Sequence, residues 1–360
     1  MSKCYTLNRK VFGGYMQYGV IEKNNLNQWF DSLQHKGMVY APQKRGYLFV
    51  FDRADSFDDV SLHHTPTILS PKKFYLPQKE LLFEFSREPF GVTKKRPEPG
   101  KYILFGVQTC DIAGIQCLDV VFGEEPVDSY YQEMKEAITI IGMECMDYCD
   151  RFASCAAVGT HVYQSGYDLL LTDMGSRYAL HIRSEKGEDL ITGHDYIREM
   201  NASDRDELTK AREEKMKRFH VEFDEDISAV DKAFDEGFFS DVWNDVGKRC
   251  VGCTNCTAVC PTCYCHDIID ELSLDMNKGK RYRIWNYCQM DDFAKVAGGQ
   301  DFRAGRGPRQ RHRYYRKFKY PLEKYNKYFC IGCGRCSRTC MAGIILIETV
   351  NSLLAERRRS

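Results

Sequence analysis

The sequence predicts an α+β fold, in which a mixed α/β domain is followed by a mainly helical domain. Up to about residue 191, short runs rich in β-branched and aromatic residues alternate with polar, helix-compatible segments. Later in the chain, apolar residues recur at helical spacing, and one cysteine motif occurs twice, at 250–260 and at 330–340. A length of 360 residues favours about two domains. We therefore expect an N-terminal α/β domain at 1–197, a charged helical linker at 198–223 and a second domain at 224–360.

Five apolar runs are the expected strands of the first domain. They are YLFVF (47–51), YILFGV (102–107), ITIIG (138–142), DLLLT (168–172) and YALHI (178–182). Between them, CDIAGIQCLD (110–119) has the pattern of a helix. The linker is dense in charge and poor in turn residues, which is typical of a solvated helix. Apolar residues at roughly helical spacing predict an amphipathic helix over 226–246.

The composition limits the possible partners and the chemistry. Fifty-one Lys and Arg balance 51 Asp and Glu, so no overall charge favours nucleic acid or an anionic membrane. The N-terminal residues contain no apolar run of the kind a signal peptide needs, and no window approaches a membrane span, so the cytoplasm is the expected location. In that reducing compartment, 17 cysteines indicate metal binding and not disulfides.

The two cysteine motifs, CVGCTNCTAVC and CIGCGRCSRTC, predict iron–sulfur clusters. A [4Fe–4S] cube needs four thiolates, and C-x2-C-x2-C lets one short loop supply three of them. In two-cluster ferredoxins, the fourth cysteine of each run ligates the cluster of the other run. This rule assigns one cluster to Cys250, Cys253, Cys256 and Cys340, and its neighbour to Cys330, Cys333, Cys336 and Cys260. The second domain is thus expected to have a bacterial-type, ferredoxin-like core with two [4Fe–4S] clusters.

Zinc is the alternative metal, but a tetrahedral zinc site uses two CxxC pairs and has no role for further cysteines at the same spacing. The proline that usually follows the fourth cysteine is present as Pro261 and replaced by Met341, so we expect a locally altered turn without loss of ligation. Cys263, Cys265 and Cys288 have no visible fourth partner. They are either buried free thiols or ligands of a further site.

The chain resembles a family of dicluster proteins that includes the iron–sulfur subunit of anaerobic sulfite reductase and the β subunit of cytosolic sulfhydrogenases. The resemblance rests on RCVGCTNCTAVCPTCYC, the following WNYC, AGGQDFR and basic segments, and CIGCGRCSRTC. Weaker matches are SPKKFYLPQKE (70–80), GVQTCDIAGIQCLD (106–119) and ECMDYCDRFASCAAVGT (144–160), so the likeness spans about residues 25–360.

The resemblance implies an electron-transfer subunit that is not itself catalytic. Such proteins stand between a reductase subunit that binds flavin and NAD(P)H and a catalytic subunit. The catalytic partner is a siroheme sulfite reductase in one branch of the family, our main interpretation, and a nickel–iron hydrogenase in the other. The sequence itself contains no G-x-G-x-x-G, P-loop, G-x-S-x-G or H-E-x-x-H motif, so nucleotide and flavin are expected on a partner.

A third [4Fe–4S] cluster is expected in the first domain. Its predicted ligands are Cys110, Cys145, Cys149 and Cys155, which come from two loops. The first of them follows a predicted strand end, where a sheet commonly presents functional residues. The family pattern places two cysteines of the later stretch one residue apart, whereas Cys149 and Cys155 are further apart here. Cys117 is an alternative ligand, and a set of ordinary buried thiols is the alternative to a cluster.

The segment from Arg303 to Lys319 is rich in Lys and Arg with interleaved aromatic residues, which by itself suggests nucleic-acid binding. The balanced net charge and the family resemblance argue against nucleic acid. We expect these cations to pair with acidic residues and to stabilise reduced, more negative clusters. Two other functions remain open. One is an iron–sulfur enzyme that uses Cys263, Cys265 and Cys288 on a sulfur compound, and the other is a redox-sensing iron–sulfur protein.

Overall fold

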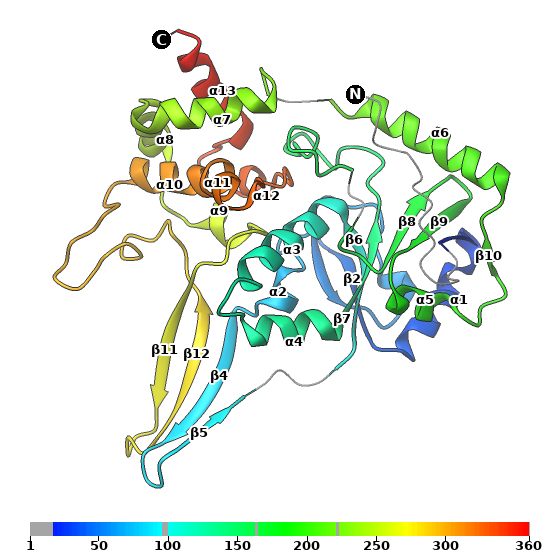
Figure 1. The fold of residues 1–360 in the computed structure, drawn as a ribbon, viewed down its shortest axis with the longest axis horizontal. Coiled ribbons are helices and arrows are strands. Elements are labelled where there is room, and N and C mark those ends of the chain that lie inside the picture. Colours follow the sequence, from blue (N-terminus) through cyan, green and yellow to red (C-terminus); the bar gives the residue numbers. More distant parts are fainter. Residues whose placement is uncertain (1–16, 96–99, 163–164, 221–222, 360) are drawn as a thin grey trace.

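A computed structural model describes residues 17–95, 100–162, 165–220 and 223–359. Its first half is built on a large mixed sheet, and its cysteine motifs lie among helices at the other end of the molecule (Figure 1). A smaller antiparallel sheet projects between the two halves. The structure is thus mixed α/β, as predicted.

The main sheet has eight strands in the order β10-β1-β9-β8-β7-β6-β2-β3. Its central strands β2, β6, β7 and β8 run parallel, and antiparallel strands extend both edges. The strands are β1 (Tyr18–Glu22), β2 (Met38–Arg45), β3 (Leu48–Arg53), β6 (Tyr102–Gln108), β7 (Ile138–Met143), β8 (Leu169–Asp173), β9 (Arg177–Ile182) and β10 (Ile197–Glu199). All five predicted apolar runs lie in or overlap these strands.

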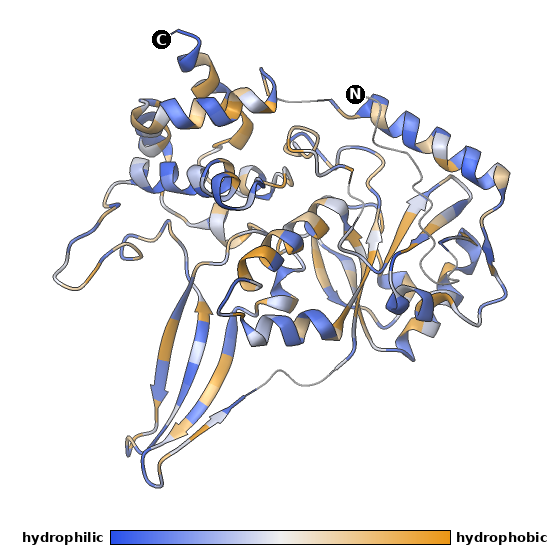
Figure 2. Ribbon diagram, viewed as in Figure 1, coloured by the Kyte–Doolittle hydropathy of each residue, from blue (hydrophilic) through white to orange (hydrophobic). Residues whose placement is uncertain are grey.

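Near-continuous apolar strands bury both faces of this sheet, as expected for parallel strands with helices on each side. Ile103 and Phe105 of β6 enter one core with helix α1, whereas Leu104 and Val107 enter the opposite core with α3 and α4. Gly106, at φ +77°, lies where the register shifts, and this irregularity resets the alternation. Figure 2 shows the apolar interior of the sheet. The covering helices are α1 (Leu26–Gln34), α2 (Lys72–Tyr75), α3 (Thr109–Phe122), α4 (Ser129–Ala137) and α5 (Glu185–Ile191), with 3-10 turns η1 (Lys23–Asn25) and η2 (Phe57–Asp59).

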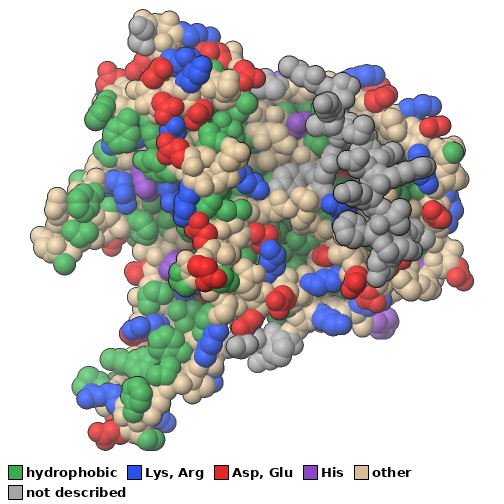
Figure 3. Space-filling model, viewed as in Figure 1, with side chains coloured by type: hydrophobic (Ala, Val, Ile, Leu, Met, Phe, Trp, Pro, Cys, Tyr) green, Lys and Arg blue, Asp and Glu red, His purple; other side chains and the backbone are tan. Residues whose placement is uncertain are grey.

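The smaller sheet joins the two halves of the chain. Its order is β11 (His266–Leu272), β12 (Lys278–Trp285), β4 (Lys79–Ser86) and β5 (Gly91–Lys94). The hairpin β11–β12 comes from between the two cysteine motifs, and Arg283 anchors it through Nε to Glu80 Oε2 at 2.8 Å. The expectation of a mainly helical second half did not include this hairpin, because β11 is largely exposed and both strands contain many charged residues. Apolar side chains gather at the free end of the sheet (Figure 3), namely Phe90, Val92, Leu272, Leu274 and Met276.

Helices around the cysteine motifs form a separate core of aromatic and aliphatic side chains, including Phe234, Trp243 and Phe318. Helices α8 and α10 approach closely because glycines meet at their contact. A Cβ on Gly247 would lie 2.5 Å from Gly307 N. The helices are α7 (Ile227–Glu236), α8 (Val242–Arg249), α9 (Asn255–Ala258), α10 (Arg306–Phe318), α11 (Tyr320–Tyr325), α12 (Arg335–Arg338) and α13 (Leu346–Arg357), with η3 (Gly237–Phe239) between α7 and α8.

The charged linker contains helix α6 (Ala202–Arg218), which is shorter than the predicted helix over 198–223. A capping box between Asn201 and Asp204 starts it. The helix is also less solvated than expected, because buried Lys215 donates to Glu144 Oε1 at 2.8 Å and to His161 O at 2.8 Å. Within the described ranges, no helix combines the length and apolar character needed to cross a membrane.

Candidate metal centres

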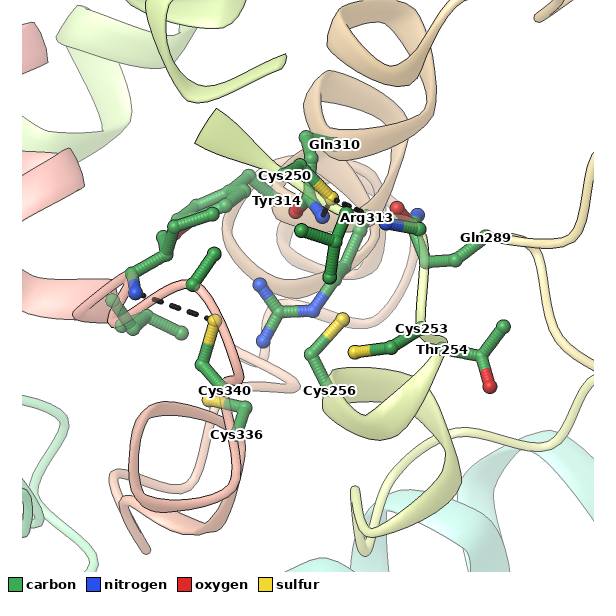
Figure 4. A pocket seen from close by; sticks show the side chains of 15 residues that line it. Cys250, Cys253, Thr254, Cys256, Gln289, Gln310, Arg313, Tyr314, Cys336 and Cys340 are labelled. Atoms are coloured by element: carbon green, nitrogen blue, oxygen red, sulfur yellow. Dashed lines mark hydrogen bonds between the residues drawn. The ribbon is translucent and has the colours of Figure 1, made fainter. Parts of the chain in front are cut away.

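The first cysteine motif lines a cavity (Figure 4). Cys250, Cys253 and Cys256 surround it, and Cys340 of the second motif reaches the same space. Gln310 and Arg313 of α10 complete the wall, together with Gln289, Tyr314 and Cys336. The structure therefore brings the last cysteine of the second motif to the first motif.

A second cavity lies beside the first. It is lined by Cys330, Cys333 and Cys336 of the second motif and by Cys260 of the first. Cys336 and Arg313 line both cavities, so the two sites share a wall.

The local backbone of each motif explains why its thiols converge. Gly252 and Gly332 adopt φ +73° and +65°, and Thr254 and Gly334 adopt φ +64° and +69° before the short helices α9 and α12. These left-handed positions turn each chain around its cavity.

N–H groups point at the sulfurs. Gly252 N donates to Cys250 Sγ at 3.4 Å, and Ile344 N donates to Cys340 Sγ at 3.3 Å. Gln310 Nε2 adds a contact of 3.1 Å to Cys250 Sγ. Hydrogen bonds of this kind tune the potential of thiolate-ligated clusters.

The altered turn expected at Met341 is not observed. Gly343 N donates to Cys340 O at 3.1 Å, and the matching bond after the first motif, from Cys263 N to Cys260 O, is 3.3 Å. The two motifs therefore end in the same hydrogen-bonded turn, with or without proline.

Buried cations surround the thiols without carboxylate partners. Among the described residues, Lys317 Nζ donates to Thr262, at 2.7 Å to Oγ1 and 3.1 Å to O, and Lys72 Nζ donates to the carbonyls of Cys260 and Cys263 at 3.1 and 2.9 Å. Arg313 is 4% exposed, and its Nε has no hydrogen-bond partner among the described residues. In that part of the chain, none of these three cations pairs with Asp or Glu. Because an uncompensated buried charge is strongly destabilising, the cavities suit anionic occupants, and a thiolate-bound iron–sulfur cube is anionic.

The raised pKa values of several thiols also indicate metal binding. Burial raises the pKa of Cys256 to about 12 and that of Cys333 to about 11, so an uncompensated thiolate is disfavoured in these cavities. A hydrogen bond from Cys263 lowers the pKa of Cys260, which makes Cys260 the first of that pair to ionise. Metal ions would supply the positive charge that the other thiolates need.

The four predicted N-terminal ligands lie near one another. Cys110 follows β6 and Cys145 follows the neighbouring parallel strand β7, so both are at the carboxyl edge of the sheet. Thr109 Oγ1 contacts Cys145 Sγ at 3.7 Å. Burial, followed by the neighbouring Cys145 and Cys155 thiols, raises the pKa of Cys149.

Cys117 points elsewhere, with its thiol 3.7 Å from Tyr328 O, and burial raises its pKa to about 11.

The loop that carries Cys149 and Cys155 packs directly on the second cysteine motif. Ser154 N donates to Gly332 O at 2.7 Å, and Thr160 Oγ1 donates to Ile331 O at 2.7 Å. Phe152 and Ser154 line the second cavity. The loop that carries the N-terminal thiols is thus next to the second cavity.

Within the described ranges, no group of three or more His, Cys, Asp or Glu side chains closes around the position of a single metal ion. The thiols instead face cavities, an arrangement that suits polynuclear clusters better than zinc. Cys263, Cys265 and Cys288 meet at another cavity beside α10.

Sequence reasoning identified the basic segment but not the role of each residue. Gln310, Arg313 and Lys317 recur at helical spacing on α10 and face the cavities, which the 3.6-residue period could have indicated. Sequence reasoning missed Lys72 and the buried pair of Arg335 with Asp111, bound through two contacts of 2.7 and 2.8 Å. No local signal in the sequence joins residues so far apart.

Comparison with known proteins agrees with this geometry. Residues 249–344 match the model of a family described as a 4Fe-4S dicluster domain. Over 340 residues the chain is 32% identical to "Sulfhydrogenase 2 subunit beta" of Pyrococcus furiosus, which covers 94% of this chain and 98% of the relative. No solved structure matches.

Proposed function

The chain belongs to the family of dicluster iron–sulfur subunits that includes this sulfhydrogenase β subunit, and from this premise we propose a hydrogenase-type electron-transfer role. In this role it relays single electrons between a protein that binds flavin and NAD(P)H and a nickel–iron catalytic subunit. The relative is named as a hydrogenase subunit, which favours this role over our first interpretation, a siroheme sulfite reductase partner.

The pair of cavities that share Cys336 and Arg313 is the observation that carries the proposal. When bound, [4Fe–4S] clusters supply reversible one-electron chemistry. The first cavity would hold its cluster through Cys250, Cys253, Cys256 and Cys340, and the second through Cys330, Cys333, Cys336 and Cys260. The shared wall makes the two sites neighbours, as an electron path requires.

The residues around the two cavities favour negative charge inside them. Arg313 faces both cavities from one buried position, so its guanidinium stabilises negative charge in either. Lys317 adds a second buried cation at the second cavity. Gln310 and the motif N–H groups donate to sulfur. These groups favour the reduced, more negative state of each site.

We propose that Cys110, Cys145, Cys149 and Cys155 hold a third cluster, which extends the path towards the main sheet. Their proximity to one another and the packing of their loop on the second motif support this assignment. A stand-alone enzyme is less well supported, because the conduit already accounts for these thiols.

Anaerobic co-purification from native cells tests the partner. We expect two proteins to accompany the chain, one that contains nickel and one that contains flavin, and we expect the isolated chain to turn over neither hydrogen nor sulfite. Copurification with a siroheme protein and no nickel would restore the sulfite reductase interpretation. Turnover by the isolated chain would contradict the conduit itself.

A matched pair of variants tests the crossed ligands. Cys340→Ser should disrupt the cluster of the first motif, and Cys260→Ser should disrupt that of the second, because each fourth thiol lies in the other motif's cavity. EPR of the reduced protein, with each signal first assigned by Cys253→Ser and Cys333→Ser, provides the measurement. If each variant instead lost the EPR signal of the motif that contains the changed cysteine, the ligation would not be crossed.

A further inference from the structure

A third cavity lies at the base of the β11–β12 hairpin, and its lining includes Arg313 and Lys317, which also line the second cavity. Cys263 and Cys265 approach it from the end of the first motif, and Cys288 approaches from the strand end opposite. The hairpin register places them together, since Asn286 N donates to Cys265 O at 3.1 Å directly after the β11–β12 ladder. His312 of α10 completes a set of four metal-binding side chains around this space.

The thiols at this cavity contact one another and the first cysteine motif. The Cys265 and Cys288 side chains are hydrogen-bonded to each other, and Cys263 is hydrogen-bonded to Cys260. Cys288 is buried, and Gln289, the next residue, lines the first cavity. The cavity is therefore continuous with the dicluster region and is not an isolated surface feature.

Cations without carboxylates surround this cavity, as they surround the other two. Arg313, Arg316 and Lys317 contribute to its lining, and buried Lys72 lies 4.0 Å from the ring of Trp285 while binding the carbonyl of Cys263. Arg316 contacts the Tyr264 hydroxyl. In the described part of the chain, no ion pair joins any of these cations to Asp or Glu. Arg313 and Lys317 also face the dicluster cavities, so Arg316 is the cation particular to this one, and a thiolate-bound cluster would supply the negative charge that three neutral thiols lack.

We propose that Cys263, Cys265, Cys288 and His312 hold an additional iron–sulfur cluster, distinct from the two clusters of the dicluster motifs and from the N-terminal thiols. Three thiolates and one imidazole satisfy the four-ligand requirement of a cube, and histidine replaces cysteine in some biological clusters. Zinc takes the same types of ligand, and metal analysis of the purified chain distinguishes it from a cluster.

This site goes beyond the proposed conduit and does not depend on which partner the chain serves. It is lined by the 262–265 segment, Cys288 and α10, whereas the loop of the N-terminal thiols lines the second cavity through Phe152 and Ser154. A cluster there gives the dicluster pair a further neighbour, and the electron path then branches at the second cavity, whose ligand Cys260 contacts Cys263.

Iron and acid-labile sulfide analysis of the anaerobically purified full chain tests the proposal. The double variant Cys265→Ser/Cys288→Ser should contain about four fewer irons and about four fewer sulfides per chain than the wild type. The EPR signals assigned to the two dicluster motifs should remain. His266→Ala, which changes an exposed histidine next to Cys265, is the matched control for His312→Ala and should keep the full iron content.

Unchanged iron in the double variant would overturn the proposal and leave the conduit intact. Zinc in place of the missing iron would also overturn it. Loss of the dicluster signals in every preparation, wild type included, would instead contradict the proposed function.

A second measurement does not depend on the folding of any variant. In the iron-loaded wild type, Cys263, Cys265 and Cys288 should resist alkylation and become reactive after anaerobic chelation of iron, as read by peptide mass spectrometry. Pulsed EPR should also show coupling of one reduced cluster to a nitrogen nucleus, and His312→Ala should abolish this coupling. Rapid alkylation of all three thiols in the loaded chain would show that they bind no cluster.

Discussion

The two cysteine motifs have the same spacing and the same turns but opposite surroundings. Val251 in the first motif is 57% exposed, whereas Ile331 at the matching position is 4% exposed. After the fourth cysteine the contrast reverses, since Pro261 is buried and Met341 is 75% exposed. The second cavity is lined by Cys330, which precedes buried Ile331, and by Cys260, which precedes buried Pro261. Both contrasts therefore show that the second cavity lies deeper in the protein than the first.

Glycine contacts show the same difference at the level of the backbone. A Cβ at Gly252 would meet nothing within 4 Å, but one at Gly332 would lie 2.4 Å from Ser154 O. Asn255 of the first motif donates to Thr339 O of the second motif at 3.1 Å, within the dicluster region, whereas its counterpart Arg335 reaches Asp111 and Thr67 in the first half of the chain. Ligand spacing thus specifies the cluster loop, and the residues between the ligands decide how deeply each site is held.

The largest effect is expected where the second motif enters the N-terminal half. Arg335→Leu should lower the free energy of unfolding by about 3–5 kcal/mol, because it leaves the Asp111 carboxylate buried without a partner. Asn255→Leu, at the matching position of the first motif, should cost about 1 kcal/mol, since it removes one partly exposed hydrogen bond. Anaerobic urea unfolding measures both. Equal losses would show that the two motifs are held equally.

Substitution of the matching glycines of the two motifs separates the effect of packing from that of backbone strain. Gly252→Ala and Gly332→Ala introduce a side chain at nearly the same left-handed φ, +73° and +65°, so strain of about 1–2 kcal/mol is common to both. Only Gly332→Ala also drives a methyl group into the Ser154–Cys155 backbone. We expect it to cost about 2 kcal/mol more in thermal unfolding than Gly252→Ala. A smaller loss for Gly332→Ala would contradict the close approach.

The sequence predicted the parts of this structure that depend on local pattern. Near-continuous apolar runs such as 102–107 and 168–172 became buried strands, because a sheet covered on both faces requires them. The repeated cysteine spacing brought each fourth cysteine to the expected cavity, since the loop geometry depends on a few adjacent residues.

Features that depend on distant partners could not be read in advance. The hairpin β11–β12 pairs with β4 through contacts some two hundred positions away, such as that of Arg283 with Glu80. Lys215 was expected in solvent, because its segment is charged throughout, but Glu144 and His161 bury it. The sequence shows which residues are charged, but only the fold shows which of them pair with a residue of opposite charge.

A smaller effect is expected at helix α6, whose Lys215 binds both ends of the 144–161 loop through Glu144 and His161. Hydrogen bonds from Arg198 and from the Asn201 backbone lower the pKa of Asp204 from 3.8 to about 2. The ionised carboxylate therefore stabilises the fold at pH values above the ordinary pKa of Asp. This contribution disappears as the pH falls through about 2, the pKa of Asp204 in the folded protein. Asp204→Asn should cost about 1 kcal/mol at neutral pH through the weakened cap.

Thermal unfolding of the metal-free chain measures this difference across acid pH. The gap between wild type and Asp204→Asn should narrow as the pH falls towards 2. A gap that is constant with pH would show that the carboxylate charge contributes nothing.

The smallest effect is expected where the second motif lacks its proline. Met341→Pro should change the free energy of unfolding by less than about 0.5 kcal/mol, because Met341 is exposed and the turn already has the hydrogen bond found after Cys260. The reciprocal Pro261→Met should cost about 1–3 kcal/mol, since α3 leaves little room there, and a Cβ on Gly114 would lie 3.0 Å from Pro261 Cβ. Iron content should be full in Met341→Pro. A lower iron content in Met341→Pro would show that the turn after Cys340 differs from the turn after Cys260, and the two loops would not be equivalent.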